Sequence, residues 1–156
     1  MWIIWDLDQT LADSAHRAHL LPNFDNSNYL DPKNWIAWEA GIMDDAPIQP
    51  AVSLLRALPD RIFNHAIVTS RGEPARAATQ AWLAANLIPY DFLYMRRIEE
   101  YSIPAAEWKT GVAEALRTYA NADVVLAFDD HPEICEAYAQ LGITAMQVHH
   151  QPEGGS

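Results

Sequence analysis

Short apolar runs that alternate with amphipathic segments are the feature that most restricts the fold of this chain. Nearly continuous apolar residues, typical of strands buried on both faces, occupy residues 2–6 (WIIWD), 66–69 (AIVT), 92–95 (FLYM), 124–129 (VVLAFD) and 143–148 (ITAMQV). Helix-like segments lie between them, at residues 51–58, 73–86, 105–119 and 132–141. This alternation predicts an α/β fold, a three-layer Rossmann-like parallel sheet with helices on both faces.

One region, residues 14–60, interrupts the alternation. Its first part, residues 14–50, contains four prolines and the turn-like stretch NFDNSN, which predicts an irregular segment with one short helix around residues 33–40. We therefore expect a single domain, residues 1–150, in which residues 14–60 form a small cap or insert. The polar end, residues 151–156 (QPEGGS), is expected to be a disordered tail.

Charge and cysteine content limit the classes of function. The chain has 21 acidic and 10 basic residues, a formal net charge of −11, which counts against broad, non-specific binding of nucleic acids. A small cationic site within an acidic protein remains compatible with this balance. The single cysteine, Cys135, fits a reducing compartment, and Asp6 interrupts the N-terminal apolar run. We therefore expect a cytoplasmic protein with no signal peptide and no contact with membranes.

Acidic, basic and hydroxyl residues lie at the carboxyl ends of the predicted strands, and Lys109 lies near the start of a predicted helix. Because those ends share one edge of a parallel sheet, their side chains should converge on one crevice. The acidic ones would repel one another strongly unless a cation neutralised them, and ligand sets made only of oxygen favour Mg²⁺. The basic and hydroxyl groups could bind a phosphate beside the metal. The acidic set is Asp6, Asp8, Asp129 and Asp130, and the phosphate-binding set is Thr69, Ser70, Arg71 and Lys109.

The order of these residues resembles the haloacid dehalogenase superfamily of phosphotransferases. The pattern consists of Asp6-Leu-Asp8-Gln-Thr10-Leu, an apolar run into Thr69, then Lys109, and finally Phe-Asp129-Asp130. It spans roughly residues 2–148, which is most of the chain. Many members have Gly at the position of Gln9, and this is the one visible departure from the pattern.

The resemblance implies a role for each matching residue. Asp6 would be the nucleophile that forms an aspartyl-phosphate, and Asp8 would be the general acid and base. Asp6 and Asp129 would ligate Mg²⁺ together with Asp8, which usually contributes its main-chain carbonyl. Asp130 would be a further ligand or an outer-shell group. Thr69 and Lys109 would hold the phosphoryl oxygens. An acid at position 8 favours hydrolysis of phosphate esters over dehalogenation.

A closer resemblance concerns the middle of the chain. Thr69-Ser-Arg71-Gly-Glu, Trp82-Leu83, Leu93-Tyr-Met-Arg96 and Lys109 are similar to the 3′-phosphatase module of bacteriophage-type polynucleotide kinases. This resemblance implies a substrate with a 3′-phosphate at a nucleic-acid end. It places Arg71 on the phosphate. The predicted contacts to the rest of the substrate are Thr10, Trp35, Trp38 and Arg96.

Alternative interpretations remain open at the level of the sequence. The aromatic residues of the insert could close a small hydrophobic core instead of stacking on a base, and the net charge favours a nucleotidase or another small-molecule phosphatase. A phosphate-binding module without catalysis would be expected to lack part of the motif set, which is complete here. A phosphomutase usually carries a large cap that excludes water, and the insert is small. No sequence feature indicates an obligate protein partner.

Overall fold

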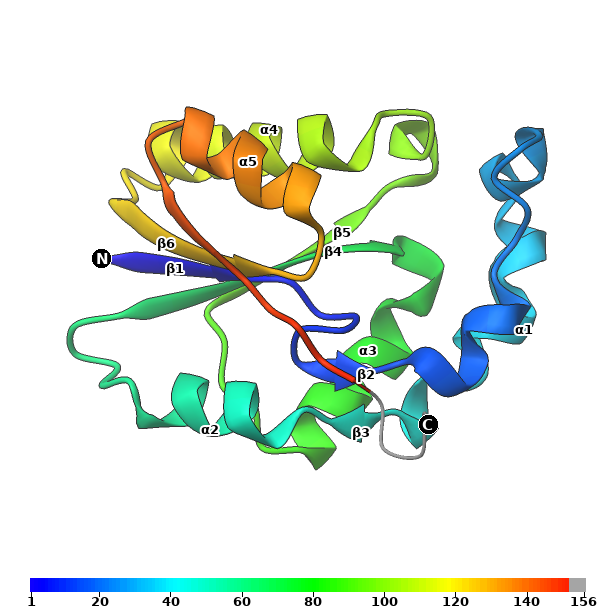
Figure 1. Ribbon diagram of the computed structural model, residues 1–156, viewed down its shortest axis with the longest axis horizontal. Helices are drawn as coiled ribbons and strands as arrows, with labels where there is room; N and C mark the ends of the chain where they lie inside the picture. The colour runs from blue at the N-terminus through cyan, green and yellow to red at the C-terminus, as the bar shows by residue number, and fades with distance from the viewer. Residues whose placement is uncertain (152–156) are drawn as a thin grey trace.

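A five-stranded sheet, parallel between every pair of neighbours, forms the centre of the molecule (Figure 1). The computed structural model describes residues 1–151, so the predicted tail lies outside the described residues from residue 152 on. The strand order is β5-β4-β1-β6-β7, which puts β1 in the middle. The strands are β1 (Trp2–Trp5), β4 (Asn64–Gly72), β5 (Phe92–Arg96), β6 (Val124–Asp129) and β7 (Thr144–Gln147).

Two helices cover each face of the sheet, which confirms the three-layer α/β prediction. Helices α2 (Gln49–Ala57) and α3 (Arg76–Ala85) lie on one face, and α4 (Ala105–Tyr119) and α5 (Pro132–Gln140) lie on the other (Figure 1). The predicted helix 73–86 begins as a 3₁₀ turn, η5 (Glu73–Ala75), with a proline in its first turn. In the part of the chain that the structure describes, no helix is long and apolar enough to cross a membrane.

The continuous apolar sequence of β1 follows from its burial on both sides. Ile3 and Trp5 pack into the core against α2 and α3, and Ile4 packs into the core against α4 and α5. The ring of Trp5 stacks on that of Phe128 in the neighbouring strand, with 4.3 Å between ring centroids. Each such side chain contributes about 1.5–3 kcal/mol when fully buried. The central strand is therefore held rigidly, and so is the residue that follows it, Asp6.

The insert leaves and rejoins the domain through a two-stranded hairpin. Strand β2 (Ala12–Asp13) pairs antiparallel with β3 (Ala46–Pro47). Between these strands the chain forms short helical turns, and Asn26 and Asp31 cap two of them by accepting hydrogen bonds from main-chain N–H groups. The predicted helix at 33–40 consists of two such turns. The turns are η1 (Ala15–Leu20), η2 (Ser27–Leu30), η3 (Pro32–Trp35), α1 (Ile36–Glu39) and η4 (Ile42–Asp44).

Candidate active site

The carboxyl ends of β1 and β6 bring Asp6 and Asp129 next to each other. The two strands pair in parallel, and the main-chain N–H of Asp6 donates to the carbonyl of Phe128 at 2.9 Å. Lys109, on α4, reaches between the two carboxylates. Its Nζ lies 2.6 Å from Asp6 Oδ1 and 2.6 Å from Asp129 Oδ2, and all three side chains are buried. Residues far apart in the sequence thus form one buried ion cluster.

The charges in this cluster are not balanced. Burial raises the pKa of Asp6 well above its usual range, and the nearby carboxylates of Asp129 and Asp130 raise it further, against the effect of Lys109. Burial likewise raises the pKa of Asp130. Burial would lower the pKa of Lys109, but Asp6 and Asp129 outweigh it and raise the pKa, so this amine stays charged. One ammonium group therefore faces three carboxyl groups.

Three of the four predicted metal ligands lie together. Asp6, Asp129 and Asp130 each offer a carboxylate oxygen, and these oxygens lie within 4.8 Å of one another. Oxygen donors with excess negative charge suit a hard divalent cation such as Mg²⁺. The carboxylate of Asp8 is not part of this group and points elsewhere.

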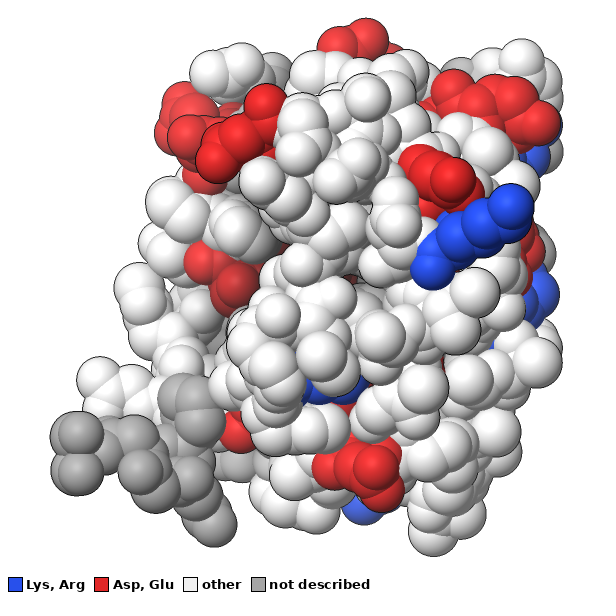
Figure 2. All heavy atoms as spheres, turned by 90° about the vertical axis from the view of Figure 1, so that its right-hand side faces the viewer, with Lys and Arg blue, Asp and Glu red and all other residues white. Residues whose placement is uncertain are grey.

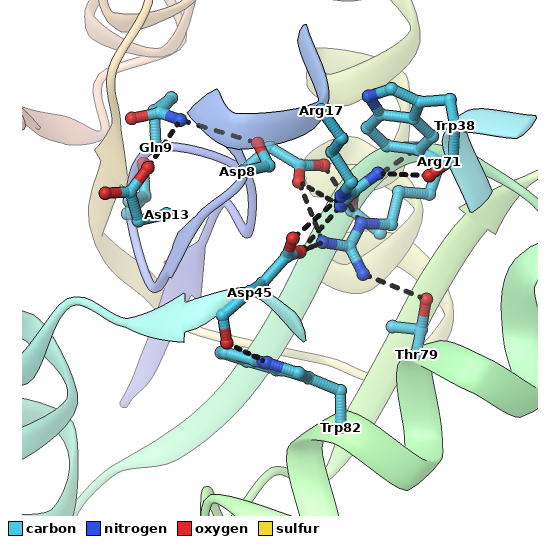
Figure 3. Close-up of polar contacts among 12 residues, drawn as sticks. Asp8, Gln9, Asp13, Arg17, Trp38, Asp45, Arg71, Thr79 and Trp82 are labelled. Carbon is cyan, nitrogen blue, oxygen red and sulfur yellow. Dashed lines mark hydrogen bonds and ion pairs between the residues drawn. The ribbon is translucent and has the colours of Figure 1, made fainter. Parts of the chain in front are cut away.

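The Asp8 carboxylate is held by two arginines (Figure 3). Arg71 donates from Nε at 3.0 Å and from Nη2 at 2.7 Å, while Arg17 donates from Nη2 at 3.3 Å. Burial would raise the pKa of Asp8, but the arginines outweigh it and the pKa is lowered. Arg71 was predicted to bind phosphate. The structure places it on Asp8, on Asp45 at 3.0 Å and on Thr79 at 3.2 Å, and its binding of phosphate stays a prediction.

Arg17 and Asp45 are site residues that the sequence prediction did not include. The Asp45 side chain is fully buried and accepts two hydrogen bonds from Arg17, at 2.7 and 2.6 Å, while its main-chain carbonyl accepts from Trp82 at 2.8 Å (Figure 3). The guanidinium of Arg17 also lies over the Trp38 ring, 3.7 Å from its centroid. The available signal was their position in the sequence, because Arg17 lies nine residues after Asp8 and Asp45 directly precedes β3, the strand that pairs with β2.

The hydroxyl residues have different environments. Thr10 donates to Asp6 Oδ2 at 3.3 Å and is buried, so it contacts the candidate nucleophile directly. Thr69 is also buried, and its Oγ1 accepts from the main-chain N–H of Arg71 at 3.2 Å. Ser70 is exposed and lines the cavity described below. Their predicted contacts with substrate and phosphate stay predictions.

Gln9 adopts a backbone conformation that explains why glycine is common at this position in the resembling superfamily. Its φ is +60°, in the left-handed region where most side chains are strained. The residue lies in the tight turn between Asp8 and β2, and its side-chain amide approaches Asp13 and Ser14. Gln9 therefore forms this turn at a cost in conformational free energy that glycine would avoid.

A cavity of about 510 Å³ opens beside these groups. The cavity is lined by four of the predicted catalytic, metal-binding and phosphate-binding residues, which are Asp6, Asp8, Lys109 and Asp130. Of the predicted substrate contacts, Trp35 and Arg96 line the cavity, whereas Trp38 lies on Arg17 and Thr10 on Asp6. The cavity is also lined by four aromatic side chains, called the aromatic wall below, which are Phe24, Tyr29, Trp35 and Tyr101.

A glycine at the end of β4 determines where Tyr101 lies. A Cβ atom on Gly72 would come within 1.8 Å of the Tyr101 hydroxyl oxygen, so only glycine permits this approach. Gly72, Tyr101 and Ser70 all line the cavity. The aromatic wall is thus fitted closely against the strand that carries the phosphate-binding candidates.

No family model matches the chain, and no curated protein matches it either. Solved structures do match. L-2-haloacid dehalogenase from Xanthobacter autotrophicus has a TM-score of 0.64 at 10% identity, with 97% of this chain and 78% of that chain covered. An enzyme from Bacteroides thetaiotaomicron that is described as belonging to the same family, in complex with magnesium and inorganic phosphate, has a TM-score of 0.58 at 14% identity. The matched region covers 99% of this chain and 95% of the Bacteroides enzyme. This chain has a haloacid dehalogenase-type fold.

A structure of the Pnkp1/Rnl/Hen1 complex is also similar in fold. It has a TM-score of 0.69 at 22% identity and covers 94% of this chain but only 44% of that chain. A second structure, of the Pnkp1/Rnl/Hen1 RNA repair complex, has a TM-score of 0.68 at 23% identity, with coverage of 94% and 41%. This chain therefore spans less than half the length of these relatives. At such identities the likeness shows the haloacid dehalogenase-type fold and leaves substrate and activity to be argued from the site.

Proposed function

We propose that this protein is a phosphomonoester hydrolase of the haloacid dehalogenase superfamily that depends on Mg²⁺ and acts through an aspartyl-phosphate on Asp6. The observation that carries the proposal is the buried Lys109 amine that contacts both Asp6 and Asp129, beside a cavity that Asp6, Asp8 and Lys109 line. A nucleophilic carboxylate, a second carboxylate for proton transfer and a fixed cation are the groups that such a reaction requires.

Mg²⁺ fits the donor atoms that are present. Asp6, Asp129 and Asp130 would hold it, and by the family resemblance the main-chain carbonyl of Asp8 would join them. The cation would supply positive charge for the phosphoryl oxygens and would relieve the repulsion that contributes to the raised pKa values of Asp6 and Asp130.

The protein's own residues perform the proton and group transfers. An Asp6 oxygen attacks phosphorus, the bond from phosphorus to the ester oxygen breaks, and Asp8 donates a proton to the departing alkoxide. Asp8 then takes a proton from water, which attacks the aspartyl-phosphate and releases phosphate and free Asp6. Lys109 orients Asp6 and offsets negative charge throughout.

Arg71 and Arg17 prepare Asp8 for the second of these steps. They hold Asp8 as a carboxylate, which is the form that a base requires. The first step requires the acid form. A substrate phosphate that attracts Arg71 would weaken its hold on Asp8 and so favour the acid form when substrate is bound.

For the substrate, we favour a 3′-phosphate at a nucleic-acid end. The support is the sequence resemblance around Thr69, Arg71 and Arg96, together with the fold likeness to proteins of an RNA repair complex. The face that carries the insert bears mostly uncharged side chains, and basic side chains appear on it as isolated spots rather than as a continuous band (Figure 2). This surface and the net charge of −11 favour a nucleotide or another small phosphate ester as the alternative.

Two further classes of function fit the site less well. A silent phosphate-binding module has no use for the complete set of Asp6, Asp8, Lys109 and Asp129. A phosphomutase would need more cover than the short turns of the insert provide. All the groups that the reaction uses come from this chain, so we expect activity without a protein partner. The single cysteine suits a reducing compartment such as the cytoplasm.

Phosphate release in the presence of Mg²⁺ tests the proposal. The panel contains 3′- and 5′-phosphorylated oligonucleotides, 3′- and 5′-mononucleotides, sugar phosphates and p-nitrophenyl phosphate. Preference for the 3′-phosphorylated oligonucleotide would support nucleic-acid end processing, and preference for a small ester would support the alternative. Absence of release from every compound would overturn the proposed function. A mutase would be revealed by phosphate transfer without net release.

A further inference from the structure

Residues 147–150, which we call the C-terminal strap, lead from the carboxyl edge of the sheet to the insert. Gln147 ends β7, where it lies opposite Asp129 in the parallel register of β6 and β7. The chain then continues to the hairpin of β2 and β3 (Figure 1). There the Nε2 atom of His150 lies 3.1 Å from Oδ2 of Asp13. The strap therefore contacts both the end of β6 and the start of the insert.

The strap holds the main chain of two adjacent metal-ligand candidates. The main-chain N–H of Val148 donates to the Asp129 carbonyl at 2.9 Å. The side-chain amide of Gln147 reaches one residue further and donates to the Asp130 carbonyl at 3.0 Å. Asp130 lies one residue beyond the end of β6, so a side chain here takes the place of a main-chain partner from the neighbouring strand. Gln147 thus fixes the main chain at the point where it turns towards α5.

Asp130 is the candidate ligand that depends most on this support. The amine of Lys109 lies 2.6 Å from both Asp6 and Asp129. The Asp129 carboxylate also accepts from the main-chain N–H of His131 at 3.0 Å. The Asp130 carboxylate lies outside these contacts and is 22% exposed, so its position depends on the turn that carries it. Because Mg²⁺ requires near-ideal octahedral geometry, a loosened turn would bind it more weakly.

The contact at the far end of the strap anchors the strap to the hairpin. His150 and Asp13 are largely buried, with 21% and 17% of their side chains exposed. The other oxygen of Asp13 accepts from the main-chain N–H of Ala15 at 3.0 Å, which fixes the carboxylate on the hairpin side. Burial would raise the pKa of Asp13, but the contact with His150 and the bond from Ala15 outweigh it and lower the pKa. The strap is therefore held at both ends.

We propose that Gln147 is a positioning residue for the metal site and that the C-terminal strap sets the affinity of this site for Mg²⁺. Gln147 acts through the main chain of Asp130, and His150 keeps Gln147 in place by anchoring the strap. The inference rests on the proposed function, because it concerns the cation that the reaction would use. It also connects the metal site to the insert, so a change at Asp13 should weaken cation binding without altering a ligand.

The test measures the Kd for Mg²⁺ by isothermal titration calorimetry without substrate, and the Tm of the metal-free protein. Gln147→Met keeps the length of the side chain and removes the donor. Loss of a hydrogen bond that supports a metal ligand typically weakens metal binding by about 10- to 100-fold, so the Kd should rise by about 10-fold or more. Gln140→Met is the matched control, because Gln140 donates to Glu136 on the exposed face of α5 and should keep the wild-type Kd.

The anchor is tested with His150→Ala. Release of the far end should raise the Kd for Mg²⁺ by about threefold, which is the size of effect that a partly exposed ion pair provides. Adding Asp13→Asn should raise the Kd no further, because both changes remove the same contact. His149→Ala, at the exposed neighbouring position, is the control and should keep the wild-type Kd.

The possible failures can be separated. An unchanged Kd in a folded Gln147→Met protein would overturn the positioning role, and a lower Tm with that unchanged Kd would show that the bond serves stability alone. An unchanged Kd in His150→Ala would overturn the anchor. In both cases Mg²⁺ binding by the wild-type protein would leave the phosphatase proposal intact. Absence of Mg²⁺ binding by the wild-type protein would overturn this inference together with the proposed metal dependence.

Discussion

Arg71 donates two hydrogen bonds to the carboxylate of Asp8, at 3.0 and 2.7 Å, from a fully buried guanidinium. The pair joins the end of β4 to the turn that follows β1. This ion pair links Arg71, which was predicted to bind phosphate, to Asp8, which was predicted to act as general acid and base.

Replacing Arg71 by Gln should change the dependence of stability on pH. The pKa of Asp8 is lowered in the folded protein, so the pair stabilises the fold above the pKa of a free carboxyl, about 3.9. That contribution is lost as the pH falls through the folded pKa. The difference in unfolding free energy between wild type and variant should therefore be largest near neutral pH and shrink below about pH 4. Urea unfolding measures it, and a difference that stays constant with pH would contradict the assignment.

Asp6→Asn should abolish phosphate release and preserve the fold. An amide cannot form the acyl phosphate, yet it occupies nearly the same volume next to Lys109. Phosphate assays and circular dichroism are the measurements. Asp123→Asn, at an exposed position, is the matched control and should retain full activity. Substantial turnover by a clean Asp6→Asn preparation would refute the mechanism.

Lys109→Met should destabilise the protein by about 3–5 kcal/mol at neutral pH, because two buried carboxylates lose their cation. The pKa of Asp6, already raised, should rise further, and a raised carboxyl pKa makes stability fall as pH rises. The loss of unfolding free energy in Lys109→Met should therefore be smaller at acidic pH than at neutral pH. Adding Asp129→Asn should recover part of the stability in denaturant unfolding. A loss that is independent of pH, with no recovery in the double variant, would show that packing and not charge is responsible.

Under the proposed function, Mg²⁺ should raise the free energy of unfolding, because it would bind the folded cluster and not the unfolded chain. At a concentration a hundredfold above Kd the increase is about 2.7 kcal/mol. The thermal shift should disappear in Asp129→Asn and Asp130→Asn and persist in Asp60→Asn, whose carboxylate is exposed outside the cluster. Chelation should also stop phosphate release, and Ca²⁺ should fail to restore it because it prefers more ligands in looser geometry. Activity after thorough chelation would contradict the metal assignment.

The sequence predicted the sheet and its helices because their signals are local. Apolar runs such as 124–129 match observed strands closely, and prolines mark helix starts such as Pro132. The convergence of Asp6 and Asp129 also follows from parallel strands that end at one edge, and Lys109 reaches them from helix α4. The site residues were expected in one crevice for that reason, and the geometry places most of them there.

The network around Asp45 could not be predicted in the same way. Arg17 and Asp45 lie 28 residues apart in an insert without periodic pattern, and nothing local tells a buried ion pair from two solvated charges. The pairing depends on how the 3₁₀ turns fold back through the hairpin. The same is true of Arg96, whose burial depends on the carbonyl groups of residues 100–103 rather than on its own neighbours in β5.

The hairpin of β2 and β3 brings the two ends of the insert side by side, next to the turn that carries Asp8. A segment tied in this way can change in length or composition at little entropic cost to the rest of the chain. The strands that carry Asp6 and Asp129 would not move, provided that Arg17 and Asp45 are retained as the tie to Asp8. Under the proposed function, catalysis and substrate selection would reside in separable parts of the molecule. An exchange of residues 18–44, which carry Phe24, Tyr29 and Trp35, would then give the same chemistry with a different substrate.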